Sequence, residues 1–132
     1  MSEKLGIKED GQPYRVLVVD DSPIIHKLIS RTLEPQRFLI CAFGNNGKEG
    51  VELYKQYNPD LVTMDVTMPI KDGIQAATEI FEINPNAKIL MLSAMGDEVI
   101  VEEAKRAGIT WFATKPFKEE EFLEIVCKIL NK

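Results

Sequence analysis

The sequence predicts an α/β fold, an open, doubly wound sheet of five parallel strands with helices on both faces. Five short apolar runs alternate with segments of helical periodicity, which is the pattern of repeated β-α units. Several of the runs are almost continuously apolar, as expected of parallel strands that are covered on both sides. The connections between runs and helical segments are short, which favours one sheet built in chain order.

The predicted strands are the five apolar runs, which are rich in β-branched and aromatic residues. They span residues 15–20 (RVLVVD), 37–43 (RFLICAF), 60–65 (DLVTMD), 87–93 (AKILMLS) and 110–114 (TWFAT).

A helix is predicted after each strand. Ser22 can cap the first helix, and Pro23 suits its first turn. The dipeptides at 58–59 and 84–85, both Asn-Pro, end the second and third helices, and Gly108 ends the fourth. The apolar residues at helical spacing are Ile25, Leu28, Ile29 and Leu33; Val51 and Tyr54; Ile74, Ala77 and Phe81; Ile100, Ala104 and Ala107; and Phe122, Ile125, Val126, Ile129 and Leu130.

Length and composition indicate one ordinary globular domain. The chain has 132 residues, of which 45% are hydrophobic and 28% charged. A net charge of −5 disfavours sequence-independent binding of nucleic acid, which needs clustered Lys and Arg. No apolar run approaches the roughly 20 residues that span a bilayer, so no membrane insertion is expected. The polar start lacks a signal-peptide core, and we expect a cytoplasmic protein with a flexible arm at 1–13 and one domain at 14–132.

The cysteines and the histidine do not suggest a metal site. Cys41 and Cys127 lie far apart among apolar residues, which predicts reduced thiols in the core. His26, the one histidine, is interpreted as a solvated helix residue beside Lys27.

Chemically active side chains gather where the predicted strands end. Asp20 and Asp21 end the first strand, Asp65 the third and Ser93 the fourth, and Lys115 follows the fifth. Each taken alone is typical of a capping turn, but ligands of such sheets bind at the carboxyl ends of the strands, where all five meet.

This set of side chains suits phosphoryl chemistry. Three neighbouring carboxylates repel one another, and a hard cation such as Mg²⁺ relieves that repulsion. A lysine and a hydroxyl beside the cation can hold a phosphoryl group, and a carboxylate can accept it as an aspartyl-phosphate.

Four stretches jointly resemble the receiver domains of two-component response regulators, and the likeness runs from Tyr14 to the C-terminus. The stretches are VLVVDDSP, PDLVTMDVTMPIKDGI, ILMLSA and AGITWFATKPF. The resemblance, which is to single-domain, CheY-like receivers, implies a flavodoxin-like fold with strand order 2-1-3-4-5.

The resemblance also implies residue roles. Asp65 would be the phosphoacceptor, and Lys115 would pair with the phosphoryl group. Mg²⁺ would be bound by Asp21 and Asp65 directly, by Asp20 through water, and by the backbone carbonyl of Thr67.

A switch is implied as well. Ser93 would donate its hydroxyl to the phosphoryl group, which would let Phe112 rotate toward the core; a plain buried strand aromatic is the simpler interpretation of Phe112. The peptide before Pro116 would be cis, and Gly73 would ease the turn into the third helix. Thr67 and Met95, two residues past Asp65 and Ser93, carry neither carboxylate nor amide, so we expect poor orientation of a hydrolytic water.

The function implied is a phosphorylation-controlled signalling module. A histidine kinase would supply the phosphoryl group, and the domain would catalyse only its own modification, not a separate enzymatic reaction. The output would be protein binding, most simply that of a chemotaxis regulator on a flagellar motor switch, with a phosphatase as a further partner.

Other functions stay open from the sequence alone. The chain fits a constitutive receiver-like interaction domain, or a phosphorelay or kinase-feedback receiver outside chemotaxis. A small phosphohydrolase with Asp65 as nucleophile lacks an evident substrate pocket. A flavodoxin-like cofactor carrier lacks the Gly-rich phosphate loop after its first strand, where the sequence has DDSP.

Overall fold

The predicted sheet is confirmed in the computed structural model, which describes residues 5–131. Five parallel strands lie in the order β2-β1-β3-β4-β5. No helix in this range is long and apolar enough to cross a membrane. The strands are β1 (Arg15–Val19), β2 (Leu39–Gly44), β3 (Leu61–Asp65), β4 (Ile89–Ser93) and β5 (Trp111–Thr114); the helices are α1 (Pro23–Leu33), the 3-10 turn η1 (Glu34–Gln36), α2 (Gly47–Tyr57), α3 (Gly73–Ile83), α4 (Glu98–Arg106) and α5 (Glu119–Ile129).

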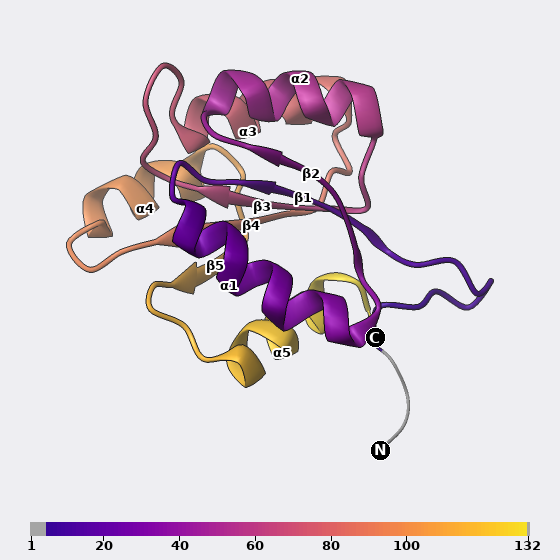
Figure 1. Cartoon of the computed structure of the whole chain (residues 1–132). Helices are drawn as coiled ribbons and strands as arrows, with labels where there is room; N and C mark the ends of the chain where they lie inside the picture. Colours follow the sequence, from indigo (N-terminus) through magenta and orange to yellow (C-terminus); the bar gives the residue numbers. More distant parts are fainter. Residues whose placement is uncertain (1–4, 132) are drawn as a thin grey trace.

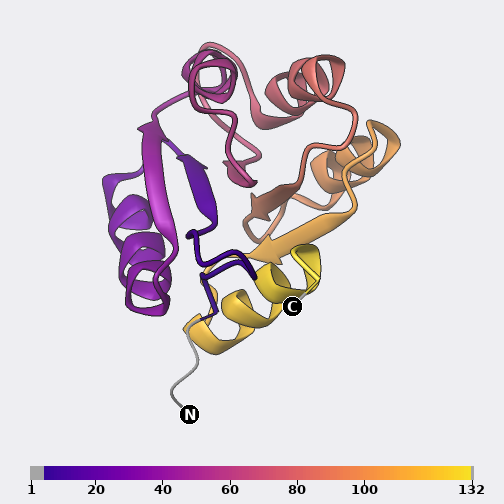
Figure 2. The same cartoon turned by 90° about the vertical axis from the view of Figure 1, so that its right-hand side faces the viewer.

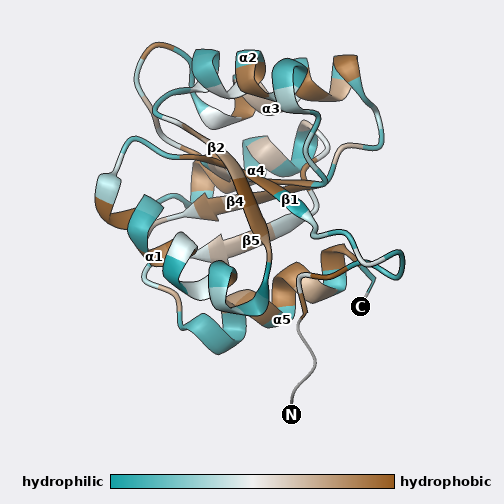
Figure 3. Ribbon diagram, turned by 45° about the vertical axis from the view of Figure 1, so that its right-hand side comes forward, coloured by the Kyte–Doolittle hydropathy of each residue, from teal (hydrophilic) through white to brown (hydrophobic). Residues whose placement is uncertain are grey.

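Helices cover both faces of the sheet. Figure 1 shows α2 and α3 on one side and α1 and α5 on the other, and Figure 2 shows the same layers with α4 beside α3. Each face has its own apolar core, one against α2–α4 and one against α1 and α5. Figure 3 shows brown, apolar residues in the strands of the sheet and both teal and brown residues in the helices around it.

The predicted helix ends agree with the structure. Ser22 caps α1, where its side chain accepts the N–H of Ile25. Asn58 and Gly108 follow α2 and α4 with φ of 45° and 105°, the left-handed conformation that ends helices.

The second strand begins two residues later than predicted. The turn η1 extends the end of α1, and Arg37 closes it with a left-handed φ of 71°. Arg37 is therefore unable to continue an extended strand, and β2 begins at Leu39.

Part of the predicted N-terminal arm, residues 1–13, packs against the domain. Gly6 donates its backbone N–H to the carbonyl of Gln36 at 2.8 Å, and Lys8 Nζ lies 3.2 Å from Asp60 Oδ1. The first four residues of the arm lie outside the described residues, so the flexibility of the arm stays a prediction.

The alternation of side chains along the strands determines which residues lie at the carboxyl end of the sheet. Alternate residues of a strand face the same side, and one set of positions in β1, β3 and β5 faces α1 and α5. Each of these columns is uncharged along its strand and ends in a charged residue at the carboxyl end of the sheet. The columns are Val16, Val18 and Asp20; Leu61, Thr63 and Asp65; and Trp111, Ala113 and Lys115.

Gly73 serves a different purpose from the one predicted. It begins α3 without the positive φ of a strained turn. A Cβ at this position would lie 2.2 Å from the carbonyl oxygen of Asp65, so glycine lets α3 begin against the end of β3.

We expect Gly73→Ala to destabilise the fold by about 2–3 kcal/mol, because backbone must shift to admit the methyl group. Urea unfolding in the absence of divalent metal measures this change. Gly44→Ala is the matched control, because a Cβ there meets its nearest neighbours at 3.4 Å. Equal losses of stability in the two variants would contradict the close-approach argument.

Candidate functional site

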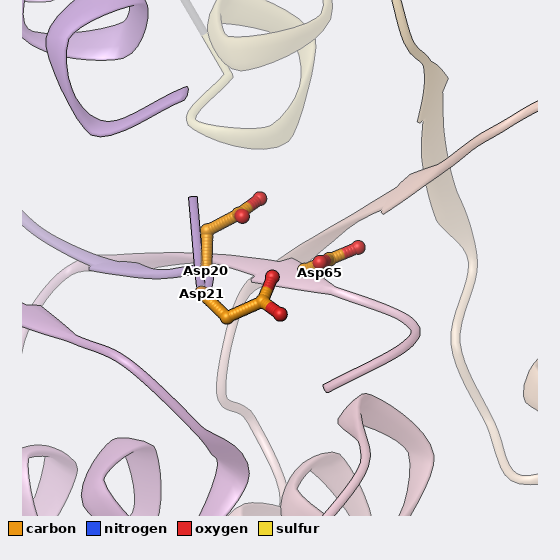
Figure 4. A group of neighbouring side chains, drawn as sticks. All are labelled: Asp20, Asp21 and Asp65. Carbon is orange, nitrogen blue, oxygen red and sulfur yellow. The ribbon is translucent and has the colours of Figure 1, made fainter. Parts of the chain in front are cut away.

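Three carboxylates meet at the carboxyl edge of the sheet. Asp20 and Asp21 follow β1, Asp65 ends β3, and one carboxylate oxygen from each lies within 4.8 Å of the others. Figure 4 shows the three side chains extending toward the same space. Asp20 is fully buried and Asp65 is 7% exposed, whereas Asp21 is exposed. The predicted acidic cluster is therefore brought together.

Lys115 supplies the positive charge of the cluster. Its Nζ lies 3.0 Å from Asp20 Oδ2 and 3.2 Å from Asp65 Oδ1. One ammonium therefore bridges the ends of β1 and β3, and it reaches them from the end of β5.

The two oxygens of Asp20 are in different situations. Oδ1 accepts the backbone N–H of Ser22 at 2.9 Å, which folds the chain into the start of α1. Oδ2 is buried with no well-aligned hydrogen bond, although it forms the ion pair with Lys115. A buried carboxylate oxygen with spare acceptor capacity, next to two further carboxylates, is a donor set that fits a hard divalent cation.

The Asp65 carboxyl is harder to ionise than an ordinary aspartate. Burial, followed by the charge of Asp20, raises the pKa of Asp65 to about 6 from its usual 3.8. Lys115 and the backbone N–H of Thr67 act in the opposite direction but do not cancel the effect.

The same surroundings favour the charged form of Lys115, whereas they disfavour the charged form of Asp65. Burial alone would lower the pKa of its ammonium, but pairing with the carboxylates of Asp20 and Asp65 outweighs burial and raises it. Lys115 therefore stays charged near neutral pH.

Ser93 and Phe112, the two predicted switch residues, line a shared hollow. Ser93 is buried at the end of β4, and its carbonyl accepts the N–H of Lys115 at 2.7 Å. The hollow has a volume of about 340 Å³ and is also bordered by Glu98 and Val101 of α4. Phe112 is partly buried on the α2–α4 side of the sheet.

The remaining predicted positions lie around this site. The peptide between Lys115 and Pro116 is cis, as predicted. Thr67 is exposed, and Met95 is 88% exposed. A role for the Thr67 carbonyl as a metal ligand stays a prediction.

His26 is a contact of this site that the sequence interpretation missed. Its side chain is half-buried, and Nε2 lies 2.6 Å from the backbone oxygen of Asp20. A helix residue four positions after the cap Ser22 can point back over the start of the helix, and that spacing was the available signal.

Comparison with known proteins identifies the domain. The family model described as "Response regulator receiver domain" matches residues 16–127. The chain belongs to the response regulator receiver domain family. The receiver resemblance predicted from the four motifs is thus confirmed.

Curated relatives of this receiver align over most of their own length. Chemotaxis protein CheY of Bacillus subtilis (strain 168) is 44% identical over 118 residues, which are 89% of this chain and 98% of that protein. Chemotaxis protein CheY of Treponema pallidum (strain Nichols) is 42% identical over 128 residues, or 96% of this chain and 89% of that protein.

Solved structures support the same fold. A chain from the crystal structure of the CheX-CheY-BeF3-Mg+2 complex of Borrelia burgdorferi superposes with a TM-score of 0.92 at 36% sequence identity. The match covers 99% of this receiver and 100% of that chain.

We expect Asp65→Asn to stabilise the metal-free receiver above pH 6. Because the pKa of Asp65 is raised in the folded state, ionisation costs stability, and that loss develops as pH rises from 3.8 to about 6. Part of the site is open to solvent, so the gain should be only about 1–2 kcal/mol. Urea unfolding across this pH range, in chelator, measures it.

The control is Glu52→Gln, which removes an exposed carboxylate from α2. It should leave the pH dependence of unfolding unchanged. A gain for Asp65→Asn that is as large below pH 4 as above pH 6 would contradict the assignment to carboxylate ionisation.

Proposed function

We propose that this receiver accepts a phosphoryl group on Asp65 and so acts as a switchable signalling module, not as an enzyme with a separate substrate. One observation carries the proposal: the Asp65 carboxylate lies 3.2 Å from the Lys115 ammonium, in a cluster with Asp20 and Asp21. That arrangement provides a nucleophile together with positive charge for phosphoryl oxygens.

The proposed reaction transfers a phosphoryl group from a histidine nitrogen to a carboxylate oxygen. A carboxylate oxygen of Asp65 attacks phosphorus, and the bond from phosphorus to the donor nitrogen of a histidine kinase's phosphohistidine breaks. The leaving imidazole keeps the electron pair and takes a proton from solvent. Lys115, which remains protonated, pairs with the transferred phosphoryl oxygens.

We propose Mg²⁺ as the cation of the acidic cluster. Asp20, Asp21 and Asp65, with the backbone carbonyl of Thr67, would hold it, and Asp20 would act through water. When bound, Mg²⁺ supplies positive charge that favours ionised Asp65 and offsets the charge of the phosphoryl group.

The switch proposed for this module connects Asp65 to the α4 side of the sheet. The Ser93 hydroxyl would turn toward a phosphoryl group on Asp65, and Phe112 would then fill the hollow that it shares with Ser93. The adjoining surface of α4 and β5 would change shape, and a protein partner would read that change.

The circuit we propose is chemotaxis. Two relatives named chemotaxis protein CheY are 44% and 42% identical and align over 98% and 89% of their lengths. The receiver would act in the cytoplasm, with a histidine kinase as donor and a flagellar motor switch as target. A phosphatase partner is supported by the similar chain in the CheX-CheY complex.

We expect acetyl phosphate with Mg²⁺ to add one phosphoryl group to the wild-type receiver and none to Asp65→Asn. Intact mass measures the addition, and beryllofluoride with Mg²⁺ should change the fluorescence of Trp111 in the wild type alone. Asp10→Asn, on the exposed part of the arm, is the control and should behave as wild type.

Other results would select other functions. An unmodified wild-type protein with no response to metal would favour a constitutive interaction domain. Continuous hydrolysis of a small phosphate ester would favour a phosphohydrolase.

We expect the phosphorylated receiver to lose its phosphate over minutes or longer when no partner is present. Neither Thr67 nor the exposed Met95 offers a carboxylate or amide that can orient a hydrolytic water. Thr67→Asn adds such an amide and should shorten the lifetime several-fold, as measured by intact mass after removal of acetyl phosphate. A lifetime of seconds for the wild-type protein alone would contradict this expectation.

A further inference from the structure

The side chain of His26 reaches from α1 back to the backbone of the acidic cluster. Its Nε2 lies 2.6 Å from the carbonyl oxygen of Asp20. A carbonyl oxygen only accepts hydrogen bonds, so Nε2 carries the proton and donates it. His26 is thus hydrogen-bonded to the peptide group that joins Asp20 to Asp21.

The imidazole is held on its other side by β2. The ring of Phe43 lies 4.9 Å from that of His26, centroid to centroid, with the planes 32° apart. The N–H of Asp20 donates to the carbonyl of Gly44 at 3.0 Å. The backbone on both sides of the Asp20 Cα is therefore tied, once to β2 directly and once through His26.

The position of the Asp21 carboxylate depends on that backbone more than the positions of the Asp20 and Asp65 carboxylates do. Asp20 and Asp65 are buried and bonded to Lys115, whereas the carboxylate of Asp21 is exposed. Within residues 5–131, no hydrogen bond or ion pair holds the Asp21 side chain. Its place in the cluster is set by the turn from which it projects.

We propose that His26 is a positioning residue for the metal site: by fixing the Asp20–Asp21 peptide, it holds the exposed Asp21 carboxylate in reach of the cation. The inference rests on the function proposed above, because it assigns His26 to the same acidic cluster. His26 does not touch the cation or the phosphoryl group, so it acts through the backbone alone.

The test compares three variants. His26→Ala removes the donor, and His26→Gln places an amide N–H at a similar reach and should restore the bond. Lys27→Ala alters the exposed neighbour on α1 and is the control. An NMR titration that follows the Asp21 and Asp65 amide signals gives the Kd for Mg²⁺.

We expect His26→Ala to bind Mg²⁺ about tenfold more weakly, and His26→Gln and Lys27→Ala to bind it as wild type does. Phosphorylation by acetyl phosphate should slow in His26→Ala at low Mg²⁺ and recover at saturating Mg²⁺. A purely structural role would lower the free energy of unfolding without changing the Kd of the folded protein.

A second measurement needs no metal. Amide hydrogen exchange at Asp21 and Ser22 should be faster in His26→Ala than in the wild type, in chelator, and normal in His26→Gln. If His26→Ala is too unstable for titration, His26→Leu takes its place in both measurements, because it also removes the donor and keeps an apolar side chain against Phe43.

The outcomes separate this inference from the proposed function. An unchanged Kd and unchanged exchange in His26→Ala, with a wild type that binds Mg²⁺ and becomes phosphorylated, overturn the role of His26 only. A weakened site that His26→Gln fails to restore also overturns it, since packing and not the hydrogen bond would then be responsible. A wild type that neither binds Mg²⁺ nor becomes phosphorylated overturns the proposed function.

Discussion

The whole arrangement depends on keeping acidic side chains out of water beside a single ammonium. Three carboxylates and one lysine leave two negative charges uncompensated when all four groups are ionised. Burial, followed by the charge of Asp20, raises the pKa of Asp65 to about 6. A divalent cation bound among the three carboxylates would balance the two remaining negative charges.

The fold makes this cluster with little irregular structure. The carboxyl ends of all strands of a parallel sheet lie at the same edge. Asp20, Asp65 and Lys115 therefore meet because each follows the uncharged residues of its strand in alternation. The two apolar cores fix the strands, and the close approach of Gly73 fixes α3 behind Asp65. Rigidity of the scaffold thus permits a site whose own charges oppose folding.

Strand ends were predictable from sequence because hydrophobic runs and their terminal residues are local patterns. The sheet, the five helices, the acidic cluster and its lysine follow from such patterns, and the cis peptide at Lys115-Pro116 follows from the family resemblance. The reason for Gly73 was missed because it depends on the close approach of α3 to the end of β3. His26 was missed because its spacing after Ser22 allows the contact with Asp20 but does not require it. Arg37 was misassigned because η1, a turn with weak sequence signals, continued past α1.

Asp65 and Phe112 lie on opposite faces of the sheet. The column that ends in Asp65 faces α1 and α5, whereas Phe112 packs on the side of α2–α4. A change at Asp65 must therefore pass around the end of β4 to reach α4, and Ser93 occupies that end. The Ser93 carbonyl accepts the backbone N–H of Lys115, and Ser93 also borders the hollow beside Phe112. This position between Lys115 and Phe112 is the reason we propose Ser93 as the link between a phosphoryl group on Asp65 and the packing of Phe112.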